Sequence, residues 1–183
     1  MMQEFQGCAS YDLQTPTSYC EALSELLEEH WPLREQMNAL KESAMKIKRQ
    51  KSHSAGEIDG LYQLMRRFKV EIDLHSSKEE DVLFEMMVKH IGRQGGPIAV
   101  MEEEHSRAKQ HIGYFFEKYG MDKGHPVEKA IELAQHVLVV YQTLTEHFMK
   151  EEQILFPMAE KLLSKEEKET LKDQFLQIKI SMI

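Results

Sequence analysis

The segment HSSKEEDVLFEMM at residues 75–87 recurs without gaps as HFMKEEQILFPMA at residues 147–159, with seven of the thirteen positions identical. The residues upstream correspond as well, in three further pairs: Glu29 with Glu104, His30 with His105, and Arg34 with Lys109. Self-similarity of this kind predicts a supersecondary unit that occurs twice. Each unit carries a single histidine and then, 45 or 42 residues later, the motif HxxxE. We therefore predict two copies of one helical hairpin.

Helix signals divide the chain into four long helices and a shorter fifth. A serine followed three residues later by a glutamate, at Ser18, Ser54 and Ser164, predicts three capped helix starts. Pro97 and Pro126 suit the first position of a helix. With apolar residues at three- and four-residue spacing, the expected helices span residues 19–50, 55–91, 97–119, 126–163 and 164–179. No segment has the pattern of a strand, so the predicted class is all-α.

Long helices joined by short loops bury their apolar faces most simply in an antiparallel up-down four-helix bundle. We expect this bundle over residues 18–163, a short N-terminal arm over residues 1–17, and a short fifth helix, within residues 164–183, packed on the bundle. Proline disrupts a helix interior, so Pro32 and Pro157 should each bend or break a helix. Unequal segment lengths also predict that the second helix overhangs the bundle or breaks near Glu85, opposite Pro157.

Composition excludes several classes of function. A length of 183 residues favours one domain. The 31 acidic residues exceed the 23 Lys and Arg, giving a formal charge of −8, which argues against nucleic acid and anionic membranes as partners. No apolar run approaches the roughly 20 residues of a membrane span, and the N-terminal residues lack a signal-peptide pattern, so a cytoplasmic location is expected. Cys8 and Cys20 are expected to be free or buried thiols.

The two HxxxE motifs point to a metal site. Helical residues four apart differ by about 40° in direction and about 6 Å in height, so His75 with Glu79, and His147 with Glu151, share a face. His30 and His75 each lie 21 residues from the turn between their helices, which places them at one level. In the second hairpin the corresponding counts leave an offset of about 9 Å, which residues 120–125 can span. Four imidazoles and two carboxylates then meet inside the bundle.

Buried carboxylates and histidines of this number are rarely tolerated without a cation. Six such ligands suit two metal ions about 3.5–4 Å apart, each bound by two nitrogens, with Glu79 and Glu151 bridging. Nitrogen and oxygen donors without thiolates favour iron or manganese over structural zinc. The predicted metal ligands are His30, His75, Glu79, His105, His147 and Glu151.

The ordered pattern of His30, His75-x-x-x-Glu79, His105 and His147-x-x-x-Glu151 resembles the hemerythrin-like (HHE cation-binding) family over about residues 19–163. Within that family the pattern is most similar to the di-iron domain of the repair-of-iron-centres proteins. This resemblance implies two iron ions, oxo- or hydroxo-bridged, with manganese possible. It also implies a small partner, O₂, NO or peroxide, and a role in oxidative or nitrosative stress protection that includes iron-sulfur repair.

Several alternatives stay open at this stage. Oxygen-carrying hemerythrins have a fifth histidine where this chain has Lys109, and ferritin-like proteins use Glu-x-x-His motifs, of which only Glu102 with His105 fits. Reversible oxygen binding, metal storage, a di-iron peroxidase or NO-reducing oxidoreductase, and a metal-free helical adaptor are the competing functions. The sequence does not fix the metal, the oligomeric state or which histidine serves which ion.

Other polar residues receive weaker assignments. We expect Glu152 to face away from the metal ligands, because five residues correspond to about 140° of helix rotation. Glu71 and Thr143 are candidates to orient the metal-binding histidines from behind. His136 is expected to line a channel, to lie in the core or to lie on the surface, and His111 is expected to point away from His105.

Overall fold

The computed structural model describes residues 16–50, 54–120 and 126–181, and these residues form helices without a strand. Two segments are π-helical, η1 (Glu79–Leu83) and η2 (Glu151–Leu155). The α-helices are α1 (Glu21–Arg49), α2 (Ala55–Lys78), α3 (Phe84–Ile91), α4 (Pro97–Gly120), α5 (Val127–Lys150), α6 (Phe156–Leu162) and α7 (Lys165–Ser181). The predicted all-α class is confirmed.

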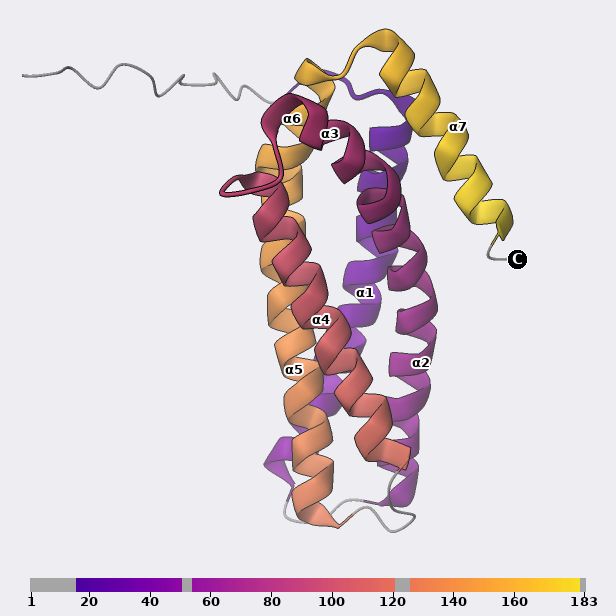
Figure 1. The fold of residues 1–183 in the computed structure, drawn as a ribbon. Helices are drawn as coiled ribbons and strands as arrows, with labels where there is room; N and C mark the ends of the chain where they lie inside the picture. The colour runs from indigo at the N-terminus through magenta and orange to yellow at the C-terminus, as the bar shows by residue number, and fades with distance from the viewer. Residues whose placement is uncertain (1–15, 51–53, 121–125, 182–183) are drawn as a thin grey trace, which may run out of the picture.

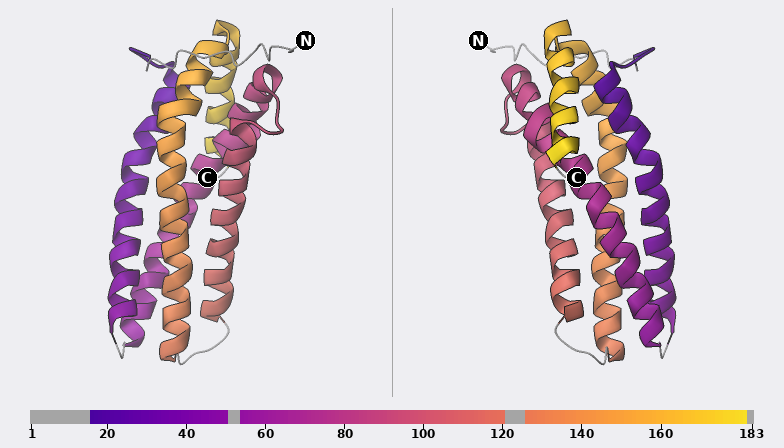
Figure 2. Two further views of the ribbon diagram at one scale, coloured as in Figure 1. Left: turned by 90° about the vertical axis from the view of Figure 1, so that its left-hand side faces the viewer. Right: turned by 90° about the vertical axis from the view of Figure 1, so that its right-hand side faces the viewer.

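The four long rods of the bundle run alternately up and down, as predicted (Figure 1). The second rod is α2 continued by η1 and α3, and the fourth is α5 continued by η2 and α6. Figure 2 shows that α4 ends short of the level at which α5 begins, which agrees with the offset expected in the second hairpin. Histidines on the two helices can therefore meet at one height.

Two apolar clusters fill the bundle. One is centred on Met37, Met65 and Phe115 in the long lower part, and the other on Leu26, Phe84 and Phe156 near the opposite end. Along α1, Leu26 belongs to one cluster and Leu33 to the other, with His30 between them. The buried histidines thus lie where the two clusters meet, and both clusters keep water from them.

The disruptions predicted near Glu85 and Pro157 take the form of π segments. The disruption predicted near Glu85 is present as η1, which ends two residues before Glu85 and immediately before α3. Figure 1 shows the chain leaning across the end of the bundle after η1. A π turn adds a residue to the helical ladder and is a common cause of kinks. Residue 157 lies just beyond η2, at the start of α6, so the bend expected there is present as a π segment.

Proline alone does not explain these bends. The first repeat has Glu85 where the second has Pro157, yet both repeats carry a π segment at the same place. At Pro32, where a bend or a break was predicted, the helix does not break, because α1 continues through it. The shared feature of the two bends is the HxxxE motif, whose glutamate begins each π segment.

Two of the three predicted capping boxes form. Ser54 and Glu57, and Ser164 and Glu167, exchange reciprocal hydrogen bonds between side chain and backbone. The box predicted at Ser18 is wrong, because α1 begins at Glu21 with Cys20 as its N-cap. The Glu21 carboxylate instead accepts a hydrogen bond from Lys172 of α7 at 2.6 Å.

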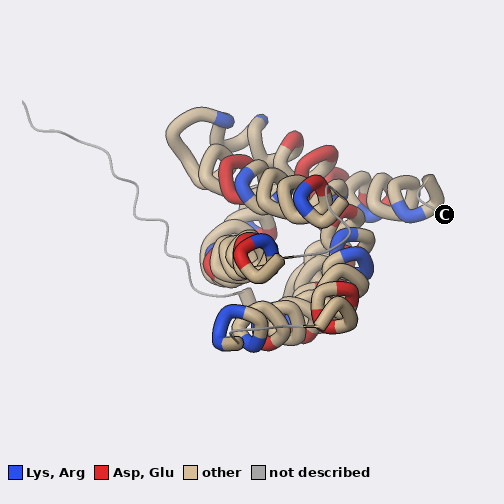
Figure 3. Tube along the Cα trace, turned by 90° about the horizontal axis from the view of Figure 1, so that it is seen from below, with Lys and Arg blue, Asp and Glu red and all other residues tan. Residues whose placement is uncertain are grey.

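Helix α7 packs beside α1 and α2 and buries Leu171 and Phe175. Its end lies to one side of the bundle (Figure 1). The expected N-terminal arm, with Cys8, lies outside the described residues except for residues 16 and 17. No described helix has the length and hydropathy required to cross a membrane. Seen from below, the bundle shows acidic and basic residues mixed with one another rather than separated by sign (Figure 3).

Candidate metal centre

The six predicted metal ligands lie together inside the bundle. Each is at most 3 % exposed, and both glutamates are fully buried. Helices α1, α2, α4 and α5 each contribute one histidine, and η1 and η2 each contribute one glutamate as their first residue. The π segments therefore begin at the residues that face the centre.

The six side chains form two overlapping groups with metal-binding geometry. One comprises His30, His75, Glu79 and Glu151, and the other comprises Glu79, His105, His147 and Glu151. In each group one potential ligand atom per residue lies within 4.8 Å of all the others. Both glutamates belong to both groups, so the arrangement has the form of two adjacent cation positions that share two carboxylates.

Unpaired atoms point into this space. The Nε2 atoms of His30 and His75 and both carboxylate oxygens of Glu79 and Glu151 are buried without a hydrogen-bond partner. Contacts such as His30 Nε2 to Glu151 Oε2, at 3.3 Å, bring the charges close without hydrogen-bond geometry. Leaving buried polar atoms unsatisfied costs about 1–3 kcal/mol each, and more for charged groups. A cation at each position would satisfy all six atoms, so the residues fit a metal centre.

The second histidine pair leads to the same conclusion. Nε2 of His105 lies 2.7 Å from Nε2 of His147. The Nδ1 atom of each ring contacts a glutamate, which favours a hydrogen on Nδ1 and a lone pair on Nε2. Two lone pairs at this separation repel unless a proton or a cation lies between the nitrogens. A shared metal ion is the arrangement that leaves both histidines neutral.

A carboxylate orients each of the four histidines from behind. The Nδ1 contacts are His30 to Glu152 at 2.7 Å, His75 to Glu29 at 2.9 Å, His105 to Glu80 at 2.6 Å, and His147 to Glu104 at 3.2 Å. Such a partner fixes the tautomer and ring orientation of a metal-binding histidine and raises its basicity. All four Nε2 atoms are thereby aimed at the centre.

Each of these carboxylates is in turn paired with a cation. Arg34 binds Glu152 at 2.6 Å, Lys109 binds Glu80 at 2.6 Å, Lys78 binds Glu29, and Lys150 binds Glu104. The four histidine–carboxylate–cation chains follow the internal repeat, because Arg34 corresponds to Lys109 and Lys78 to Lys150. The two halves of the repeat therefore match in the residues that surround the centre as well as in the six predicted ligands.

The buried histidines and glutamates of the centre change one another's pKa values. Burial favours neutral His30 and His147, but the carboxylates around them outweigh this, raising the pKa of His30 to about 8 and that of His147 to about 10. Burial and the neighbouring Glu151 raise the pKa of Glu79. Burial would also raise the pKa of Glu151, but His147 and His30 hold it well below its usual value. Without a metal, protons on the imidazoles balance the carboxylate charge.

The sequence prediction of which residues contact the four histidines on the side away from the centre is partly wrong. Glu152 does lie outside the ligand group, but it contacts His30, a role that was not anticipated. Glu71 accepts a hydrogen bond from Gln36, and the positions proposed for Glu71 and Thr143 are taken by Glu29 and Glu104. The repeat contained the missed signal, since a glutamate precedes His30 and His105 in both copies and follows Glu79 and Glu151 in both.

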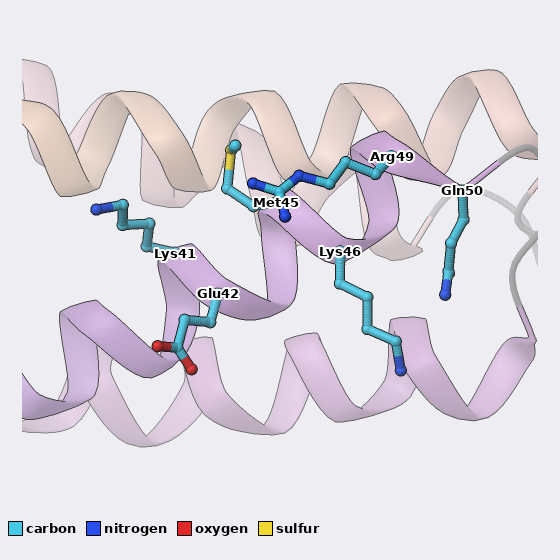
Figure 4. A pocket seen from close by; sticks show the side chains of 6 residues that line it. All are labelled: Lys41, Glu42, Met45, Lys46, Arg49 and Gln50. Carbon is cyan, nitrogen blue, oxygen red and sulfur yellow. The ribbon is translucent and has the colours of Figure 1, made fainter.

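Other features lie apart from this centre. His90 contacts Glu167 at 2.9 Å, and Nδ1 of His111 lies 2.9 Å from Nδ1 of His136. His53 and His125 lie outside the described residues. A surface pocket near the end of α1 contains none of the buried histidines (Figure 4), and its lining residues are Lys41, Glu42, Met45, Lys46, Arg49 and Gln50.

Comparison with known proteins agrees with the geometry. The family model of the hemerythrin HHE cation-binding domain matches residues 21–159. Proteins named iron-sulfur cluster repair protein YtfE, from Salmonella paratyphi B, Salmonella newport and Salmonella heidelberg, are each 30% identical over 131 residues, covering 69% of this chain and 59% of the relative. The chain thus spans less than two thirds of the length of these relatives. No solved structure matches it significantly.

Proposed function

Because the chain belongs to the hemerythrin family of HHE cation-binding domains, we propose that it is a non-haem di-iron protein. His30 and His75 would hold one iron, His105 and His147 the other, and Glu79 and Glu151 would bridge them. The observation that carries this proposal is the set of six buried nitrogen and oxygen atoms that face one space without hydrogen-bond partners. Nitrogen and carboxylate donors without thiolate favour iron, with manganese as the second choice.

We propose further that the centre reacts with or senses O₂, NO or peroxide. Two nitrogens and two bridging carboxylates are four donors per ion, fewer than the six that iron commonly accepts, which leaves room for a small ligand. Bound iron would supply the electrons for such chemistry. The protein excludes bulk water, since Phe148 stacks on His30 with centroids 4.2 Å apart and Phe84 lies 5.6 Å from His105. Small uncharged molecules enter such an apolar surrounding more readily than ions do.

The biological role we infer is protection against oxidative or nitrosative stress, including repair of iron-sulfur clusters. Its support is the printed name of the relatives, iron-sulfur cluster repair protein. A cytoplasmic location remains an expectation from the sequence.

Reversible oxygen carriage is the second candidate, and the position of Lys109 counts against it. Lys109 occupies the place where a fifth histidine would be expected, but its ammonium group binds Glu80 and points away from the centre. Metal storage and turnover as a di-iron peroxidase or NO-reducing oxidoreductase are further alternatives. An enzyme would consume many equivalents of peroxide or NO per di-iron centre, whereas a sensor would react with about one.

The test is to reduce the iron-loaded full chain without oxygen and to mix it with O₂, NO or peroxide while recording visible spectra. A spectral change with each that saturates near one equivalent per di-iron centre supports reaction or sensing. Continuous turnover identifies an enzyme instead, and full reversal under vacuum identifies an oxygen carrier. No change with any of the three contradicts the proposal. The control variant His90→Ala should behave as the parent protein does.

A further inference from the structure

A second pair of histidines lies on the outside of the bundle, between α4 and α5. The Nδ1 atoms of His111 and His136 are 2.9 Å apart, and their ring centroids are 5.1 Å apart. Both residues are half-buried. The ring of Tyr114 packs against both imidazoles, with centroid distances of 6.0 and 5.5 Å.

This pair differs from the other histidines in the described part of the chain. His30, His75, His90, His105 and His147 each contact a carboxylate, whereas His111 and His136 contact each other. Burial, His136 and Arg107 lower the pKa of His111. Burial also lowers the pKa of His136, opposed by Glu132 and assisted by Lys118. Both shifts favour the neutral imidazoles, which is the state in which imidazole binds metals.

The distance between the two nitrogens suits a metal ion. Two nitrogens that are each about 2.0–2.1 Å from an ion, at about 90° to one another, are about 2.9 Å apart. Rotation of the two rings is enough to direct both lone pairs at a common point. The imidazole whose Nδ1 carries the hydrogen transfers it to its own Nε2, so ion binding changes the charge of neither ring. A 90° angle is typical of Cu²⁺ and Ni²⁺, which prefer square-planar or octahedral coordination.

We propose that His111 and His136 form a peripheral site for a borderline divalent cation of the Cu²⁺ or Ni²⁺ type, with water completing the coordination. Glu132, one turn before His136, supplies negative charge nearby, although it is now paired with Lys118 at 3.0 Å. The site is separate from the buried centre. His111 lies six residues after His105, and His136 eleven before His147, which correspond to about 9 and 16 Å of helix. The proposal does not depend on the identity of the buried metal.

The experiment titrates Cu²⁺ into the iron-loaded full chain and follows binding by electron paramagnetic resonance, with iron content measured in the same samples. We expect one copper equivalent whose spectrum contains hyperfine coupling to two nitrogens. His111→Ala and His136→Ala should each weaken this binding by about tenfold or more, because one nitrogen ligand is lost. Iron content should not change in either variant.

His90→Ala is the matched control, since it removes a half-exposed histidine from elsewhere on the surface. It should leave the copper spectrum and affinity unchanged. Thermal melts verify that every variant is folded. Parent-like copper binding in either His111→Ala or His136→Ala, or a spectrum without coupling to two nitrogens, would overturn the proposal. Loss of iron together with copper would assign the binding to the buried centre instead, and would overturn it as well.

Discussion

The Nδ1 atom of His30 lies 2.7 Å from Oε1 of Glu152, a residue 122 positions later and in the other half of the internal repeat. The symmetric contact joins His105 to Glu80 across the halves in the opposite direction. By contrast, His75 with Glu29, and His147 with Glu104, are paired within one half. The two hairpins therefore complete each other's histidine environment, and neither contains all the partners of its own ligands.

Replacing Glu152 by Gln should lower iron affinity about 10–100-fold, the usual effect of losing the carboxylate behind a metal-binding histidine. Glu80→Gln, its symmetric counterpart, should have a similar effect. Competition with a chelator measures both. Glu28→Gln is the control, because Glu28 is exposed. Equal iron affinity in Glu152→Gln, Glu80→Gln and Glu28→Gln would show that these contacts do not orient the ligands.

Glu79→Ala and Glu151→Ala should each lose bound iron, because each carboxylate belongs to both groups of potential ligands. Iron should raise the melting temperature of the parent protein but not of these variants. Calorimetry with and without iron measures the difference. Parent-like stabilisation by iron in both variants would refute bridging by these residues.

Lys78→Met should destabilise the protein by about 1–3 kcal/mol, the cost of leaving a hydrogen-bonded charge without its partner. Lys78 is fully buried, binds Glu29 and Glu25, and lies 5.8 Å from the centre of the Phe175 ring on α7. Its counterpart Lys150 is 32 % exposed, so Lys150→Met should cost less than about 1 kcal/mol. Urea denaturation of metal-free protein measures both. A larger loss for Lys150→Met would contradict this difference.

The metal-free and iron-bound proteins should respond to pH in opposite directions. The pKa of His30, about 8, and that of His147, about 10, exceed the ordinary value of 6.5. Their contribution to metal-free stability is therefore full below about pH 6.5 and is lost as pH rises through 8 to 10. Iron needs the deprotonated rings, so its affinity should rise over the same range.

Melting temperatures between pH 6 and 10, with and without iron, measure this opposition. Above pH 6.5 the stabilisation by iron should grow as the metal-free protein weakens. Parallel pH profiles for the two forms would mean that the histidines do not bind the metal.

Much of the fold and of the site geometry followed from the repeat. Matching HxxxE motifs predicted which six side chains meet, because helix geometry fixes the relative direction and height of residues on regular helices. The same rule failed to find the role of Glu152. It assumes an uninterrupted α-helix, whereas Glu152 lies in η2, where π-helical hydrogen bonding changes the rotation per residue.

Local signals were less reliable where tertiary contacts compete with them. Ser18 and Glu21 have the spacing of a capping box, but Glu21 binds Lys172 of α7 and Cys20 donates its backbone N–H to Glu160 at 2.7 Å. These partners lie more than 130 residues away in sequence, so local spacing cannot anticipate them. The repeat contains cations at equivalent positions, such as Arg34 and Lys109. It does not predict which carboxylates they bind, because those lie on other helices.

The most direct test of the di-iron assignment is anomalous scattering at the iron absorption edge from a crystal of the iron-loaded protein. The account predicts two iron peaks, one among His30, His75, Glu79 and Glu151 and the other among Glu79, His105, His147 and Glu151. A single peak, a peak outside these two groups, or anomalous signal only at the zinc edge would contradict it.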